Sequence, residues 1–196
     1  MSNEENLQTD FRRKANLILD RLSPSEQKEL LIKCWMSHDA GWFMAVAAEY
    51  VVQATNRLNQ IAAHEIGKVE ARRIFHALQS PPVKTIDDYL LFQEVFISLL
   101  GPNLMDYHLR KVSDHAYQAQ VQRCFASENA PRAGIADEYE CGIFARITGW
   151  LDALGLSYEM SPSLGKCLKF QQRECRYTFN FKQEASSGDI QSAINE

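Results

Sequence analysis

The most constraining feature of the sequence is a long helical pattern that a pair of prolines ends. A helix start stands at residues 23–26 (SPSE), with Ser as the N-cap, Pro at the first helical position and Glu at the capping-box position. Helical periodicity then continues, with one break near Tyr50, as far as Pro81-Pro82. The pattern predicts two long helices, about 25–50 and 53–79, joined by a tight turn or a kink.

Beyond the prolines the sequence predicts one more helix and then a β-hairpin. The helix covers 85–100, with Thr85 as its cap. Period-two alternation over 106–112 and 115–125 predicts the two strands of the hairpin. The alternation places Tyr117, Ala119, Val121 and Arg123 on one face of the second strand and Gln118, Gln120, Gln122 and Cys124 on the other.

The last third of the chain returns to a helix and then to strands. An apolar stripe predicts a helix over 141–156, and short strands are expected at 156–161, 166–170 and 175–181. The fold class is therefore α+β, with long N-terminal helices packed on a small antiparallel sheet that carries a further helix.

We expect one compact unit, because 196 residues with 45% hydrophobic composition are enough to bury one substantial core. Its parts are an N-terminal tail and short helix (1–24), a helical part (25–103), an α/β part that carries the cysteines (104–182) and a polar, disordered tail (183–196).

Charge and segment composition exclude several classes of partner. The chain has 21 basic and 25 acidic residues, a net charge of -4, so it has no basic excess to neutralise nucleic acid. Its first residues are polar and acidic, unlike a secretory signal, and no apolar run is long enough to span a membrane. We therefore expect a cytoplasmic protein that binds neither nucleic acid nor a membrane, in which cysteines serve as core residues, metal ligands or redox groups.

Three of the five cysteines have the spacing of a metal site. Cys141 begins the predicted helix at 141–156, and Cys167 and Cys175 follow in the strand region, so the three thiolates can converge on one zinc ion. Glu159 is the first choice for a fourth ligand. A filled zinc shell of this kind would be structural, because it leaves no open position for a substrate. The alternatives to Glu159 are Glu138, Glu140, Glu174 or water, and the alternative to zinc is that the cysteines are buried core residues.

A stripe of aromatic and titratable residues predicts a ligand pocket on the first long helix. Trp35, His38, Asp39 and Trp42 follow three-and-four spacing, so they lie near one face. His38 is the candidate general base, and Asp39 would orient it or a ligand. The alternative is that His38 is a satisfied core or interface residue.

The second long helix supplies two amides that could face this stripe. Asn56 and Asn59 lie three residues apart and can donate to a carboxylate or a carbonyl. Either Cys34 or Cys124 could act as a nucleophile if His38 approached it, but no spacing in the sequence brings them together.

Residues 106–181 resemble the 4-vinyl-reductase domain in their strand-strand-helix-strand-strand order and in the elements YECG, GWLDALG and C-x7-C. The resemblance implies a small-molecule-binding α/β module that is often dimeric, and a zinc ion held by three cysteines and an acidic residue. Here the positions before Cys167 read SLGK, without an acid. A three-cysteine site, a site completed by water and a vacant site therefore all stay open.

Residues 25–181 also resemble an uncharacterised family of bacterial and archaeal cytosolic proteins that is sometimes labelled as similar to L-2-amino-thiazoline-4-carboxylic acid hydrolase. The shared elements are W-x2-HD-x2-WF at 35–43, N-x2-N at 56–59 and GK-x-E-x-R at 67–72. The family usually has glycine at the helix junction, where this chain has Val51.

These observations favour a small-molecule-binding protein with a structural zinc ion and a pocket lined by Trp35, His38, Trp42, Asn56 and Asn59. One alternative is a hydrolase of small cyclic amide-like or thiazoline carboxylate substrates, in which His38 and Asp39 activate water. Another is a dimerising adaptor whose aromatic face is its interface. We expect a homodimer in each case.

Overall fold

A computed structural model describes the backbone of residues 3–182 and the side chains of residues 10–182. The disordered tail that we expected over 183–196 lies outside the described residues. The chain divides into two compact units, Met1–Trp42 and Phe43–Glu196. No helix among the described residues combines the length and the apolar character needed to cross a bilayer.

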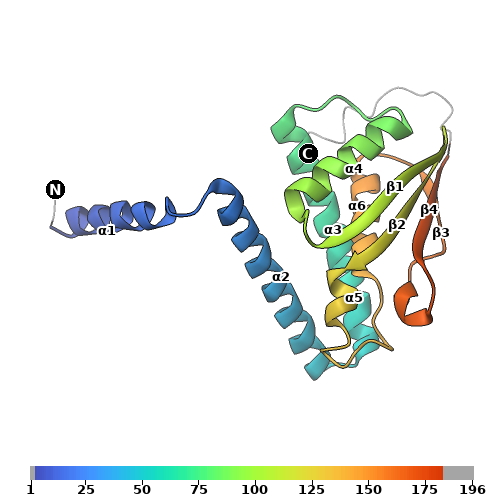
Figure 1. Cartoon of the computed structure of the whole chain (residues 1–196), viewed down its shortest axis with the longest axis horizontal. Helices are drawn as coiled ribbons and strands as arrows, with labels where there is room; N and C mark the ends of the chain where they lie inside the picture. The colour runs from blue at the N-terminus through green and yellow to red at the C-terminus, as the bar shows by residue number, and fades with distance from the viewer. Residues whose placement is uncertain (1–2, 183–196) are drawn as a thin grey trace. The chain divides into compact units, whose positions relative to one another are not determined.

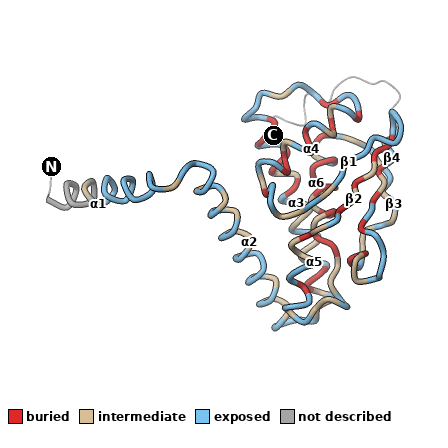
Figure 2. Tube along the Cα trace, in the orientation of Figure 1, coloured by how far each residue is buried: buried red, intermediate tan, exposed pale blue. Residues whose placement is uncertain are grey.

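The first unit contains α1 (Asn3–Leu19) and most of α2 (Pro24–Glu49). α1 begins at Asn3, within the tail that we had expected to precede the short N-terminal helix. The predicted capping box is present at the start of α2, since Ser23 donates its N–H and its hydroxyl to Glu26 Oε2, each at 2.8 Å, and accepts the Glu26 N–H at 3.3 Å. None of the residues of α2 is buried, as Figure 2 shows by its exposed and intermediate colours.

The second unit contains the other helices and all of the strands (Figure 1). In chain order they are α3 (Val52–Leu78), α4 (Ile86–Leu100), β1 (Met105–Ser113), β2 (Ala116–Cys124), α5 (Phe125–Asn129), α6 (Gly142–Ala153), β3 (Tyr158–Ser161), the 3-10 helix η1 (Leu168–Gln171) and β4 (Cys175–Phe181). The α+β class is confirmed, with a small antiparallel sheet.

One expected strand is wrong. Residues 166–170 do not join the sheet: Lys166 forms only an isolated bridge with Glu140, and the chain then enters η1. η1 ends at Gln171, and the left-handed φ of 55° at the next residue, Gln172, turns the chain toward β4. The segment therefore serves as a turn that brings Cys167 and Cys175 back toward one another.

The sheet has the order β1-β2-β4-β3, and every neighbouring pair is antiparallel. Tyr117 pairs with Phe179 and Ala119 with Tyr177, so their side chains share the covered face. In Figure 1, α4 and α6 lie against this face.

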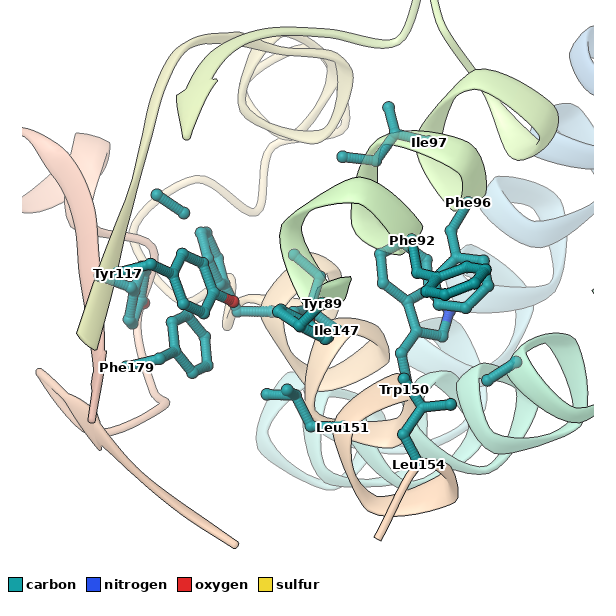
Figure 3. Close-up of a cluster of buried hydrophobic side chains, with 14 of the residues drawn as sticks. Tyr89, Phe92, Phe96, Ile97, Tyr117, Ile147, Trp150, Leu151, Leu154 and Phe179 are labelled. Atoms are coloured by element: carbon teal, nitrogen blue, oxygen red, sulfur yellow. The ribbon is translucent and has the colours of Figure 1, made fainter. Parts of the chain in front are cut away.

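Aromatic rings fill the space between the sheet and the helices. Tyr117 and Phe179 stack with ring centroids 4.9 Å apart and point toward Leu151 of α6 (Figure 3). Farther from the sheet, Phe96 of α4 packs on Trp150 of α6 at 5.1 Å. These contacts fix α6 between the sheet and α3.

Two glycines let α3 and α6 cross closely. A Cβ at Gly149 would overlap the carbonyl group of His64, and a Cβ at Gly67 would overlap that of Arg146. Beside the crossing, Glu70 of α3 is buried and pairs with Arg146. Its carboxylate also accepts the indole N–H of Trp150 at 3.0 Å, so the charge is fully partnered.

Candidate functional site

Four cysteines from separate segments line one small cavity in the second unit. Cys124 ends β2, Cys141 is the N-cap of α6, Cys167 precedes η1 and Cys175 begins β4. All four are buried and free, and their cavity has a volume of about 20 Å³. This is room for about one water molecule or one ion.

Hydrogen bonds hold the segment of Cys141 against the segment of Cys167. The Cys141 N–H donates to Gly165 O at 2.9 Å, and the Cys167 N–H donates to Tyr139 O at 3.0 Å. With the bridge between Glu140 and Lys166, these bonds form a two-stranded strap, residues 139–141 and 165–167. The strap fixes the relative positions of two of the three predicted zinc ligands.

One turn of α3 fixes the strap from outside. Asn56 is fully buried, and its amide donates to Glu138 O at 2.6 Å and accepts the Glu140 N–H at 3.2 Å. Gln60 donates to Cys141 O at 3.5 Å, and the Asn59 amide lies against Gly142. The two asparagines that we assigned to ligand binding thus contact the chain around Cys141, and their role toward a ligand stays a prediction.

Burial dominates the electrostatics of the cavity. It raises the pKa of Cys124 and Cys141 above the ordinary thiol value and that of Cys175 to about 12. Backbone N–H groups next to Cys124 and Cys141 act in the opposite direction, but less strongly. Without a cation these thiols are protonated and unreactive, so we do not expect Cys124 to act as a nucleophile.

The structure does not bring Glu159 to the cysteines. Glu159 pairs with Asn180 on β4, five residues from Cys175, a distance of about 17 Å along a strand. Its side chain is 71% exposed and pairs with Lys182 at 3.1 Å. Glu138 and Glu174, two of the other candidates, are exposed and bonded to Gln53 and Arg176.

The cysteines suit zinc by donor type and by number. Four thiols around a cavity of one-ion size are the donor set of a common structural zinc site. As the side chains stand, no three His, Cys, Asp or Glu residues in the described part of the chain are arranged to hold a metal ion. Each sulfur turns about a single torsion, so the backbone positions are the more informative feature.

The predicted stripe on α2 lies on an exposed helix in the first unit. His38 Nδ1 is 3.8 Å from Asp39 Oδ1, and their side chains are 78% and 56% exposed. Trp42 is exposed, and Trp35 is half-buried. These four residues and the two asparagines belong to different units, and the pocket predicted among them stays a prediction.

A groove that we did not predict lies between α3 and α6. It has a volume of about 310 Å³ and is lined by Arg57, Gln60, Ile61, His64, Glu65, Ala145, Thr148 and Leu164. Its histidine is oriented by two carboxylates, because His64 Nε2 lies 2.7 Å from Asp152 Oδ2 and Nδ1 lies 3.3 Å from Glu65 Oε1. Burial and then the charge of Asp152 raise the pKa of Tyr158 to about 12, which places a neutral phenol beside this carboxylate.

A β-bulge explains why the sequence pattern misplaced Cys124. Asp106 pairs with Arg123 but Tyr107 pairs with Val121, so Gln122 is an extra residue in β2. The extra residue shifts the alternation and moves Cys124 to the face of Val121, into the cavity. The signal in the sequence that could have placed Cys124 at this site is that a fourth cysteine stands at the end of a predicted strand, near the other three in the predicted sheet.

The sequence also held a signal for the groove. Arg57, Gln60 and His64 recur at helical spacing on α3, and Asp152 lies on the predicted helix that follows Cys141. Only the close crossing at the two glycines shows that these faces meet.

No protein-family model, curated protein or solved structure matches the chain.

Proposed function

We propose that the chain is a cytoplasmic small-molecule-binding protein whose ligand site is the groove between α3 and α6 and whose C-terminal half is braced by zinc. The observation that carries the proposal is the convergence of Arg57 and His64 with apolar side chains in one groove. Its volume of about 310 Å³ suits a small molecule.

The lining favours a ligand with an apolar body and a carboxylate. Ile61, Ala145 and Leu164 offer apolar surface, and Arg57 offers a planar guanidinium that matches a carboxylate in two hydrogen bonds. Glu65 forms an ion pair with Lys68 at 2.9 Å, which weakens the repulsion between its carboxylate and an anionic ligand. Small heterocyclic carboxylates combine these features.

The test is binding of 2-amino-thiazoline-4-carboxylate and a panel of other small carboxylates by calorimetry, with Arg57→Ala as the variant. Loss of a charged hydrogen-bonded pair should weaken the Kd about 10- to 100-fold. Arg73→Ala is the matched control, because Arg73 is exposed on the same helix and does not line the groove. Equal affinities of the two variants would contradict the proposed site.

A hydrolase of small cyclic amide-like or thiazoline carboxylate substrates is the second candidate. The pair of His64 and Asp152 favours it, because a carboxylate on one ring nitrogen orients a histidine to act as a general base through the other. Nδ1 would be the basic nitrogen, so a substrate or water would have to replace its longer contact with Glu65, at 3.3 Å. We had assigned this role to His38 and Asp39. Turnover of the thiazoline carboxylate by the unmutated chain, by His64→Gln and by His38→Gln separates the assignments: the substitution that abolishes turnover marks the base.

Exposed apolar side chains support the homodimer and, with it, the adaptor alternative. In the first unit Phe11, Leu31 and Trp42 are 65%, 71% and 68% exposed. α2, which carries Leu31 and Trp42, has no buried residue, so its apolar side chains offer a surface for a second copy to cover. Light scattering over a concentration series, with Trp42→Arg as the variant, tests the proposal: a monomer at all concentrations would exclude the homodimer.

A further inference from the structure

We propose that Cys124 is the fourth ligand of a zinc site that Cys141, Cys167 and Cys175 complete, so that the ion is held by four thiolates. The inference rests on the zinc brace of the proposed function and assigns the ligand that the sequence left open. In this assignment Cys124 takes the place of the acidic ligand that the family resemblance implies and that this chain lacks before Cys167.

The bulge in β2 is the first observation that supports Cys124. In regular alternation Cys124 would share the face of Gln120, away from the cavity, but the extra residue at Gln122 reverses its direction. Val121 pairs with Cys175, so the ends of β2 and β4 that carry the two cysteines are adjacent. The bulge thus re-aims one side chain at the place where the other three meet.

The second observation is that the four segments are held together by backbone contacts that do not depend on the sulfurs. The strap joins the segments of Cys141 and Cys167, and the β2–β4 pairing joins those of Cys124 and Cys175. Asn56 fixes the strap to α3. These contacts hold all four cysteines on the walls of one cavity, and metal binding would require rotation of their side chains toward a common point.

The charge around the cavity is the third observation. Zinc with four thiolates carries a net charge of about -2, which is costly to bury without a cation nearby. Lys169 lines the same cavity, and its ammonium donates to Gln122 O at 2.6 Å, on the bulge itself. The lysine therefore holds the bulge and places a positive charge beside the proposed thiolates.

The experiment counts the ligands of zinc in the full chain. Zinc K-edge absorption spectra of the unmutated protein should show four sulfur atoms at about 2.3 Å and no nitrogen or oxygen. Three sulfurs with one oxygen or nitrogen would overturn the assignment of Cys124 and leave the zinc brace standing. No zinc in the purified protein and no uptake on titration would overturn both.

Variants give an independent answer. Cys124→Ser should weaken zinc binding at least ~10-fold, in competition with a chelating dye, and should replace one sulfur by oxygen in the spectrum. Cys34→Ser, on exposed α2, and Glu159→Gln, at the far end of the sheet, should keep one zinc ion and four sulfurs. Cys124→Ser with unchanged affinity, or Glu159→Gln with a lost ligand, would overturn the proposal. If Cys124→Ser does not fold, the spectrum of the unmutated protein decides.

Discussion

Substitution of Gly149 by alanine should destabilise the second unit, although alanine is the better helix former. In an exposed helix the change would gain about 1 kcal/mol. Here the added Cβ would lie 3.0 Å from the carbonyl carbon of His64, closer still to its oxygen, and 3.1 Å from Lys68 N. Overpacking in a core costs about 1–3 kcal/mol where side chains can move, and backbone atoms yield less. We therefore expect a net loss of about 2 kcal/mol, or about 4–8 °C in Tm.

Urea unfolding followed by circular dichroism measures this loss as a change in the free energy of unfolding. Gly41→Ala is the matched control, because Gly41 lies inside α2 with no atom within 4 Å of its added Cβ. The control should keep or raise the helix content. A free energy of unfolding for Gly149→Ala within about 0.5 kcal/mol of the unmutated value would refute the close crossing of α3 and α6.

Three further substitutions test other contacts of the second unit. Asn56→Ala should cost about 1–3 kcal/mol in urea unfolding, because it removes the hydrogen-bond partner of two partly buried backbone groups; a smaller loss would mean that the amide does not hold the strap. Glu70→Gln should cost about 3–5 kcal/mol by the same measurement, since it removes the charged partner of Arg146 at a site where both side chains are largely buried. Thr85→Ala should lose the N-cap of α4 and about 1 kcal/mol. Backbone N–H groups hold the pKa of Asp88 below its ordinary value of 3.8. The stability that the ionised carboxylate contributes to the fold is therefore complete above pH 3.8 and is lost as the pH falls through the lowered pKa. Thermal melts of Asp88→Asn should accordingly show a smaller loss of stability in acid than those of the unmutated chain.

Local signals predicted most of the fold. The capping box at Ser23 and the Thr85 cap are present, and α2 and α3 begin and end close to the predicted bounds. Period-two alternation placed Tyr117 and Ala119 on one face of β2, and this face is buried in the structure. These features depend on residues a few positions apart, so a single sequence contains them.

The predicted positions of Cys124 and Glu159 differ from the structure because each depends on the register between two strands. One inserted residue in β2 reversed the direction of Cys124, and the pairing of β3 with the far end of β4 removed Glu159 from the cysteines. Neither a bulge nor the offset between two strands leaves a composition signal in a short segment. The choice of the fourth ligand therefore could not be made from spacing alone.

Three of the residues shared with the resembled family, all on α3, have structural contacts in this chain. Asn56 bonds two backbone groups of the segment before Cys141, Gly67 allows the helix crossing, and Glu70 partners Arg146. Polar residues in a motif suggest a ligand site because the sequence does not show whether these side chains are buried or which groups they bond. In the structure each of them joins α3 to α6 or to the strap.

The proposed brace and the proposed groove share that strap, which connects the two proposals physically. Leu164, three residues before Cys167, lines the groove, and Gln60 lines it while bonding the carbonyl of Cys141. An ion that holds Cys141 to Cys167 would therefore also fix one wall of the groove, although no thiolate faces a ligand there. Zinc would act on binding by limiting the motion of this wall, which is the role of a structural metal and not of a catalytic one.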